Sequence, residues 1–214
     1  MGLEAEGGID LLGVLVHEVS HRWLMFIGDI AGCNENPNLS VKCAKAPTGF
    51  RVNESNGAHW SANVDTFVKE NGVVFKNPIG GSAWQMNAGG YCSGIPATGN
   101  GVRFNDIDLY LMGFLSSNET RPIYWYDFTG DASDLGQKCT QHTISAQDII
   151  NMEGALQPAY PMAQRDFKIG FILLTAPGQS ATPQQINRMN YIIDNFSVAW
   201  NEATRKKSTM NIPQ

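Results

Sequence analysis

Two histidines and a glutamate in the sequence His-Glu-Val-Ser-His, residues 17–21, have the types and spacing needed to bind a metal ion and activate water. They lie in an apolar segment, 11–26, whose length and composition predict a buried helix. Side chains four residues apart lie on the same face of a helix, so His17 and His21 can bind one ion together. Glu18 is then placed to reach a water molecule beside the ion as a general base. The spacing predicts a catalytic zinc site.

Chance occurrence of the motif is the first alternative, and the neighbouring residues argue against it. Almost every other side chain of the segment is apolar, which leaves little of the helix for solvent. Burying two imidazoles and a carboxylate without partners would cost on the order of several kcal/mol. A metal ion supplies the missing partner. A degenerate or purely structural site is the other interpretation of the same pattern.

A catalytic zinc site needs a third protein ligand and an open position for water. No third histidine follows in the helix, so the ligand is expected elsewhere, the candidates being His59, Asp65, Asp106, Asp108, Glu119 and His142. Asp108 is the preferred ligand because it is an acid within the otherwise apolar segment 104–114. In the alternative interpretation Asn105 caps a helix there and both aspartates favour its positive end. Asp106 is the weaker candidate.

Two further residues are candidates for the chemistry. His59, beside an aromatic residue in His59-Trp60-Ser61, is either a donor to the transition state, an alternative metal ligand, or a histidine without a role in the site. Tyr110 has the hydroxyl needed to stabilise a developing oxyanion, although a tyrosine packed in the core is an equal alternative.

The remaining pattern predicts an α+β fold in one domain over residues 1–214. Asn71-Gly72 predicts the turn of a β-hairpin between strands at 64–69 and 73–76. Apolar spacing predicts a second buried helix over 104–114, and aromatic residues predict a short strand over 123–128. The apolar run 167–175 predicts a buried strand.

Two further helices show their starting signals in the sequence. Ser145 and Asp148 form a capping box for a helix that ends near Gly154. Thr182 caps the last helix, with Pro183 in its first position. One apolar stripe of this helix is expected to pack in the core: Ile186, Met189, Ile193, Phe196 and Trp200.

Composition limits the classes of partner. The net charge of −5 and the absence of a basic stripe predict no nucleic-acid partner, and the cluster 205–207 is expected at a solvated helix end. No apolar run has membrane-spanning length without charge, which predicts no membrane span. The four cysteines predict the pairs Cys33–Cys43 and Cys92–Cys139 and a secreted or extracellular protein, although no signal peptide is visible.

Three blocks of sequence carry a resemblance to a known group. His17-Glu18-Val19-Ser20-His21-Arg22-Trp23, then His59-Trp60-Ser61, then residues 106–113 resemble mostly bacterial secreted proteins with HExxHRW, HWS and D-x-YLMG blocks in this order. The resemblance continues through 144–154, 166–174 and the closing helix. It implies kinship with the zincin metallopeptidases, and hence a zincin-like fold, a Zn²⁺ cofactor and a peptide or protein substrate. Asp108 with Tyr110 resembles the aspartate-zincin pattern, in which the Asp binds zinc and the Tyr assists.

One departure from the zincins concerns the sheet. Zincins place a twisted β-sheet before the active-site helix, and its edge strand holds the substrate, whereas only sixteen residues precede His17. Either the chain is a fragment or the hairpin at 64–76 supplies the edge. We therefore expect a zinc-dependent metallopeptidase. The alternatives are a non-catalytic or degenerate binding module of a larger secreted protein and, less favoured, a zinc hydrolase acting on a non-peptide amide.

Overall fold

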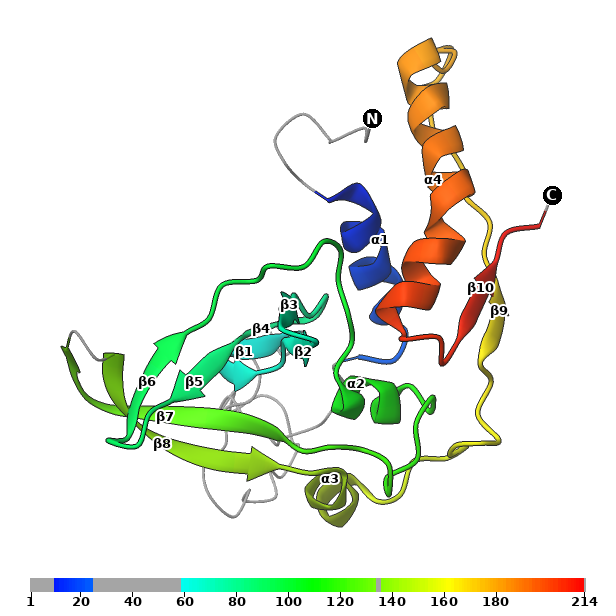
Figure 1. Ribbon diagram of the computed structural model, residues 1–214. Coiled ribbons are helices and arrows are strands. Elements are labelled where there is room, and N and C mark those ends of the chain that lie inside the picture. The colour runs from blue at the N-terminus through cyan, green and yellow to red at the C-terminus, as the bar shows by residue number, and fades with distance from the viewer. Residues whose placement is uncertain (1–9, 25–58, 134–135, 214) are drawn as a thin grey trace, which may run out of the picture.

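A six-stranded, mostly antiparallel sheet and a long C-terminal helix are the largest elements of the computed structural model (Figure 1). The structure describes residues 10–24, 59–133 and 136–213. The strand order is β4-β1-β7-β8-β6-β5, in which only β1 and β4 run parallel. The strands are β1 Trp60–Asp65, β4 Gly80–Ser82, β5 Trp84–Met86, β6 Tyr91–Gly94, β7 Ile123–Ser133 and β8 Gly136–Ile144. The predicted α+β class is confirmed.

The helix that carries the metal-binding motif is α1, Leu11–Ser20. Asp10 caps it, because the Asp10 carboxylate accepts a hydrogen bond of 3.0 Å from the backbone N–H of Gly13. The helix is shorter than predicted, since it ends at Ser20 and residues 21–24 form a turn. The predicted end of this segment and the predicted pair Cys33–Cys43 lie outside the described residues.

The predicted hairpin is confirmed as β2, Val68–Glu70, and β3, Val73–Phe75. Asn71 and Gly72 both adopt positive φ, at 51° and 79°, as a two-residue hairpin turn requires. The predicted first strand is split, however, because its first residues belong to β1. The hairpin forms a separate two-stranded sheet, so it does not supply an edge of the six-stranded sheet.

Capping boxes begin the two short helices; the sequence predicts the box at Ser145, and the box at Asn105 agrees with the alternative interpretation of that segment. Helix α2, Asp106–Leu111, is capped by Asn105, and α3, Ala146–Glu153, is capped by Ser145. In both helices the aspartate three residues after the cap bonds back to the backbone of the capping residue. The strand predicted over 123–128 is longer in the structure, because β7 continues in a hairpin with β8.

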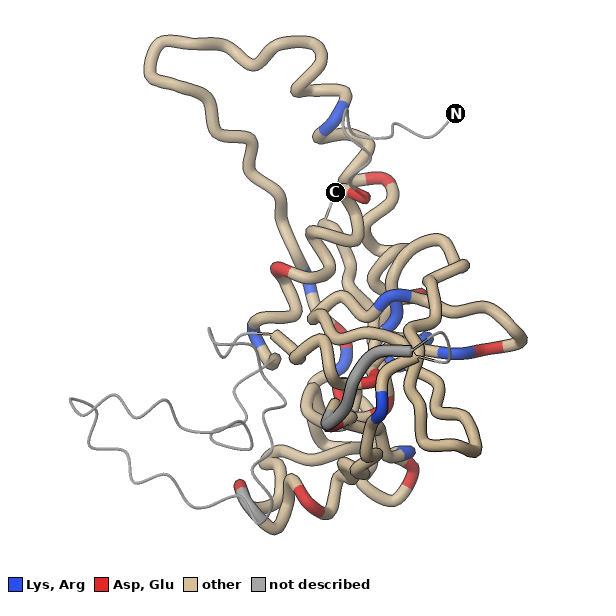
Figure 2. The backbone as a smooth tube through the Cα atoms, turned by 90° about the vertical axis from the view of Figure 1, so that its left-hand side faces the viewer, with Lys and Arg blue, Asp and Glu red and all other residues tan. Residues whose placement is uncertain are grey.

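The predicted strand 167–175 is wrong beyond Lys168. Only β9, Asp166–Lys168, is a strand, and it pairs in parallel with β10, Thr209–Asn211. The rest of the run lies outside any sheet, and both Ile172 and Leu174 are 82% exposed. Figure 2 shows this part of the chain as a long loop that projects from the body of the molecule.

The last helix, α4, spans Pro183–Ala203 and is capped by Thr182 as predicted. Its apolar stripe is only half buried: Phe196 and Trp200 lie in the core, whereas Ile186 is 45% exposed. The buried half packs against α1 (Figure 1). The prediction that the whole stripe belongs to the core is therefore wrong for Ile186 and Ile193, which are both exposed.

The predicted disulfide Cys92–Cys139 is present and joins β6 to β8. It packs with Tyr126 in a small buried cluster apart from the main core. A disulfide is compatible with an extracellular protein. Within the described ranges, no helix has the length and apolar character to cross a membrane.

Candidate metal centre

Three histidines from two separate parts of the chain converge at one point. His17 lies in α1, His21 is the residue that ends this helix, and His59 directly precedes β1. The Nε2 atom of His17 lies 3.1 Å from Nε2 of His21 and 3.3 Å from Nε2 of His59. Together they could hold a metal ion, since their ligand atoms all lie within 4.8 Å of one another.

Backbone carbonyl groups orient two of the three imidazole rings. Nδ1 of His17 lies 2.7 Å from the carbonyl oxygen of Pro78, and Nδ1 of His21 lies 3.1 Å from that of Leu24. A carbonyl oxygen only accepts hydrogen bonds, so each Nδ1 carries a hydrogen, and in this tautomer the lone pair of each ring is at Nε2. Two lone pairs 3.1 Å apart repel each other unless a cation or a proton lies between them. The donor set therefore fits a metal ion.

Glu18 lies at the open margin of the three histidines. Its Oε1 atom is 3.8 Å from Nε2 of His17, and its side chain is 64% exposed. A cavity of about 600 Å³ adjoins both residues, lined on its other sides by α1, by segment 76–78 and by the glycine-rich loop 99–102. The carboxylate can therefore reach a molecule that lies in this cavity beside the imidazole of His17.

Asp108, the preferred third ligand, lies in a different environment. It is fully buried, and its Oδ1 accepts a hydrogen bond of 2.8 Å from the indole Nε1 of Trp60. Its Oδ2 accepts from the side-chain amide of Asn77 and from the backbone N–H of Asn105. Burial raises the pKa of this carboxyl to about 6, against the opposing effect of the hydrogen bonds. The structure thus brings His59, the alternative ligand, to the histidine pair and leaves Asp108 outside the group.

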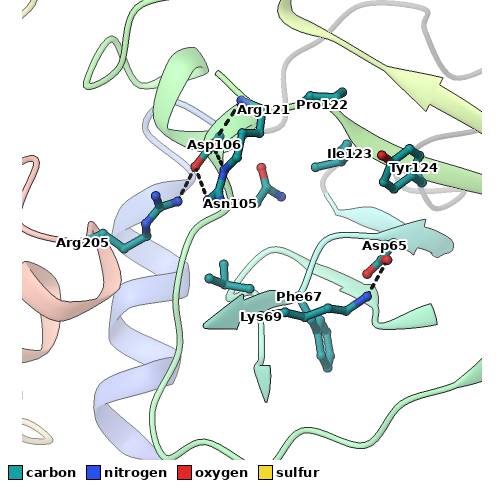
Figure 3. A pocket seen from close by; sticks show the side chains of 11 residues that line it. Asp65, Phe67, Lys69, Asn105, Asp106, Arg121, Pro122, Ile123, Tyr124 and Arg205 are labelled. Atoms are coloured by element: carbon teal, nitrogen blue, oxygen red, sulfur yellow. Dashed lines mark hydrogen bonds and ion pairs between the residues drawn. The ribbon is translucent and has the colours of Figure 1, made fainter. Parts of the chain in front are cut away.

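Asp106, the weaker candidate, is held by two arginines (Figure 3). Arg121 donates to its carboxylate from Nε at 2.6 Å, and Arg205 donates from Nη1. Burial alone would raise the pKa of Asp106, but the two guanidinium groups outweigh this effect and lower the pKa to about 2. Arg205 also lies 3.5 Å from Glu70. The prediction that residues 205–207 lie at a solvated helix end is therefore wrong for Arg205.

The remaining candidates also lie outside the group of three histidines. Tyr110 is buried in the main hydrophobic core on α2, in agreement with the alternative interpretation of this residue. Asp65 forms an ion pair of 2.7 Å with Lys69, and the exposed Glu119 accepts a hydrogen bond from Ser116. The ring of His142 lies 4.7 Å from that of Trp125.

Asn77 and Pro78 are residues of the site that the sequence did not indicate. Asn77 is buried beside Asp108, and Pro78 orients His17 through its backbone carbonyl. Every residue has a backbone carbonyl group, so no sequence signal could have identified the role of Pro78. Comparison with known proteins gives no relative: no family of proteins, no curated protein and no solved structure matches the chain.

Proposed function

We propose that this protein is a zinc-dependent metallopeptidase in which His17, His21 and His59 bind the metal and Glu18 is the general base. The convergence of three Nε2 atoms supports this proposal most strongly. In a tetrahedral zinc site with Zn–N bonds of about 2.0–2.1 Å, two nitrogen ligands lie about 3.3 Å apart. The two Nε2 separations, 3.1 and 3.3 Å, fit this requirement.

Three protein ligands leave one tetrahedral position open, which distinguishes a catalytic zinc site from a closed structural one. When bound, zinc polarises the scissile carbonyl and lowers the pKa of a bound water towards about 7. Glu18 accepts the proton of the attacking water and later passes it to the leaving amine. The carbonyls of Pro78 and Leu24 keep both helix histidines in the tautomer that donates from Nδ1.

The same proposal includes a zincin-like arrangement of the substrate. The cavity beside His17 and Glu18 provides room for a peptide between α1 and the loop 99–102. Strand β4 begins two residues after Pro78 and is an edge of the six-stranded sheet. An edge strand offers backbone groups to an extended peptide, so we propose β4, rather than the β2–β3 hairpin, as the substrate-binding edge.

Zinc content and peptide hydrolysis, measured together on four proteins, test the proposal. The wild type should contain about one zinc ion per chain and cleave a mixed peptide library. Glu18→Gln should retain the zinc and lose about 10²–10⁴-fold in turnover. His59→Ala should lose zinc and activity, whereas His142→Ala, a histidine outside the site, should keep both.

Three results would contradict the proposal. A wild-type protein that takes up no zinc even after reconstitution would show that the three histidines do not form a zinc site. A Glu18→Gln protein with full activity would show that Glu18 is not the general base. Zinc binding without cleavage of any peptide would favour the alternative of a metal-containing binding module.

A further inference from the structure

Asp108 joins the two chain segments that shape the candidate metal centre. We infer that Asp108 is a positioning residue that holds His59 and His17 in place through Trp60 and Asn77. The inference rests on the proposed metal site, and it assigns a role to a buried carboxylate that touches none of the three imidazoles through any hydrogen bond of the described residues.

The first connection runs through Trp60, the residue after His59. The indole Nε1 of Trp60 donates to Oδ1 of Asp108 at 2.8 Å, and the backbone N–H of Trp60 donates to the carbonyl of Ile79 at 2.9 Å. Trp60 is fully buried. Its side chain and its backbone are thus both fixed, which restricts the backbone from which the His59 imidazole extends.

The second connection runs through Asn77, the residue before Pro78. The Asn77 amide donates to Oδ2 of Asp108, while its Oδ1 accepts a hydrogen bond of 2.8 Å from the backbone N–H of Ile79. These bonds hold the turn that directs the Pro78 carbonyl to His17. The Asp108 carboxylate therefore supports His59 through Trp60. Through Asn77 it also supports the Pro78 carbonyl, which fixes the tautomer of His17.

The chemistry of this position requires a carboxylate. Three N–H donors converge on its two oxygens: the indole of Trp60, the amide of Asn77 and the backbone of Asn105. An asparagine has one acceptor oxygen, so its NH₂ group would face at least one of these donors. A buried donor without an acceptor destabilises its surroundings, which here include both connections to the metal centre.

Asp106 provides a matched control on the same helix. It is the same residue type, is also buried and lies two positions away, yet its carboxylate binds Arg121 and Arg205 instead of the residues beside the histidines. Asp106→Asn and Asp108→Asn should both lower the melting temperature. Only the Asp108 variant should change the metal site.

Zinc affinity, measured by competition with a chromophoric chelator, and the visible absorption spectrum of the Co²⁺-loaded protein test the inference. Asp108→Asn should weaken zinc binding by about 10–100-fold, the range for residues that orient ligands, and should alter the Co²⁺ spectrum. Asp106→Asn should leave the affinity within about twofold of the wild type and the spectrum unchanged. If Asp108→Asn does not fold, Trp60→Phe, which removes the indole N–H and part of the buried ring but keeps the backbone bond to Ile79, should weaken binding in the same direction.

The possible outcomes separate this inference from the proposed function. Equal effects of Asp106→Asn and Asp108→Asn on affinity would show a merely structural role and overturn the inference, while leaving the zinc site intact. Complete loss of zinc in Asp108→Asn combined with retention in His59→Ala would make Asp108 a direct ligand and would also overturn it. A wild type that binds neither Zn²⁺ nor Co²⁺ would overturn the metal site itself, and the inference with it.

Discussion

The ion-pair cluster around Asp106 should make a contribution to stability that is lost at acid pH. The substitution Asp106→Asn should remove this pH-dependent contribution. The carboxylate is buried between Arg121 and Arg205, and its pKa is about 2 in the folded protein, below the ordinary value of 3.8 for an aspartate. Each pKa unit corresponds to about 1.36 kcal/mol, so the shift contributes about 2 kcal/mol to the free energy of unfolding.

The lowered pKa of Asp106 determines how its contribution to stability changes with pH. Because the folded pKa lies below the unfolded one, the contribution is fully present above about pH 5 and is lost as the pH falls towards 2. Asp106→Asn removes the charge at every pH. Urea unfolding should therefore show a stability difference between wild type and variant that is about 2 kcal/mol larger at pH 7 than near pH 2. At neutral pH this contribution corresponds to about 4–8 °C in Tm for a chain of this size.

A stability difference that stays constant between pH 7 and pH 2 would refute the reasoning, because it would mean that the arginines do not lower the pKa of Asp106. Arg205→Met is the companion variant. It removes one of the two guanidinium groups and keeps the apolar stem, so its pH dependence should be smaller than that of the wild type and larger than that of Asp106→Asn.

Two further experiments test the disulfide and the backbone geometry. Replacing Cys92 and Cys139 by serine opens a cross-link with a sequence separation of 47 and should lower the free energy of unfolding by about 4 kcal/mol in urea titrations; a change below 1 kcal/mol, on the order of a surface substitution, would contradict this. Gly81→Ala should lower Tm more than Gly72→Ala, because both glycines have positive φ but only at position 81 would the new Cβ overlap the side chain of Thr66. Equal changes in Tm for the two variants would show that the side chain of Thr66 moves away from the new Cβ without a loss of stability.

Local signals in the sequence predicted the starts of the elements well. Asp10, Ser145 and Thr182 cap the helices that they were expected to cap, and Asn71-Gly72 forms the hairpin turn. Each of these signals acts within a few residues, because a cap or a tight turn is satisfied by its own neighbours in the chain. The spacing of His17 and His21 was informative for the same reason.

The third member of the histidine group could not be identified from the sequence, because distant residues decide it. An acid in an apolar segment must find either a metal ion or hydrogen-bond donors, and both explanations fit the sequence around Asp108. Two of the three donors that satisfy it come from Trp60 and Asn77, which are 48 and 31 residues away. Only the folded arrangement shows that these donors occupy the carboxylate and that His59 joins the histidine pair.

Apolar pattern alone also overestimated burial. The run that contains Ile172 and the first turns of α4 have the composition of core elements, yet Ile172 and Ile186 are exposed among the described residues. A pattern states that a face is apolar, whereas burial requires a second surface against it. The α1 helix provides that surface for the half of α4 that contains Phe196 and Trp200.

The distribution of the three histidines along the chain has a consequence for folding. His21 and His59 are 38 positions apart, so an ion bound to both would close a loop almost as long as the one closed by Cys92–Cys139. By the entropy of loop closure, bringing these two ligands together in the unfolded chain would cost about 4 kcal/mol, so the ion would bind the folded chain preferentially and metal loading would become part of folding. A chelator would then lower the stability of the protein through the metal site, and a reductant would lower it through the disulfide Cys92–Cys139.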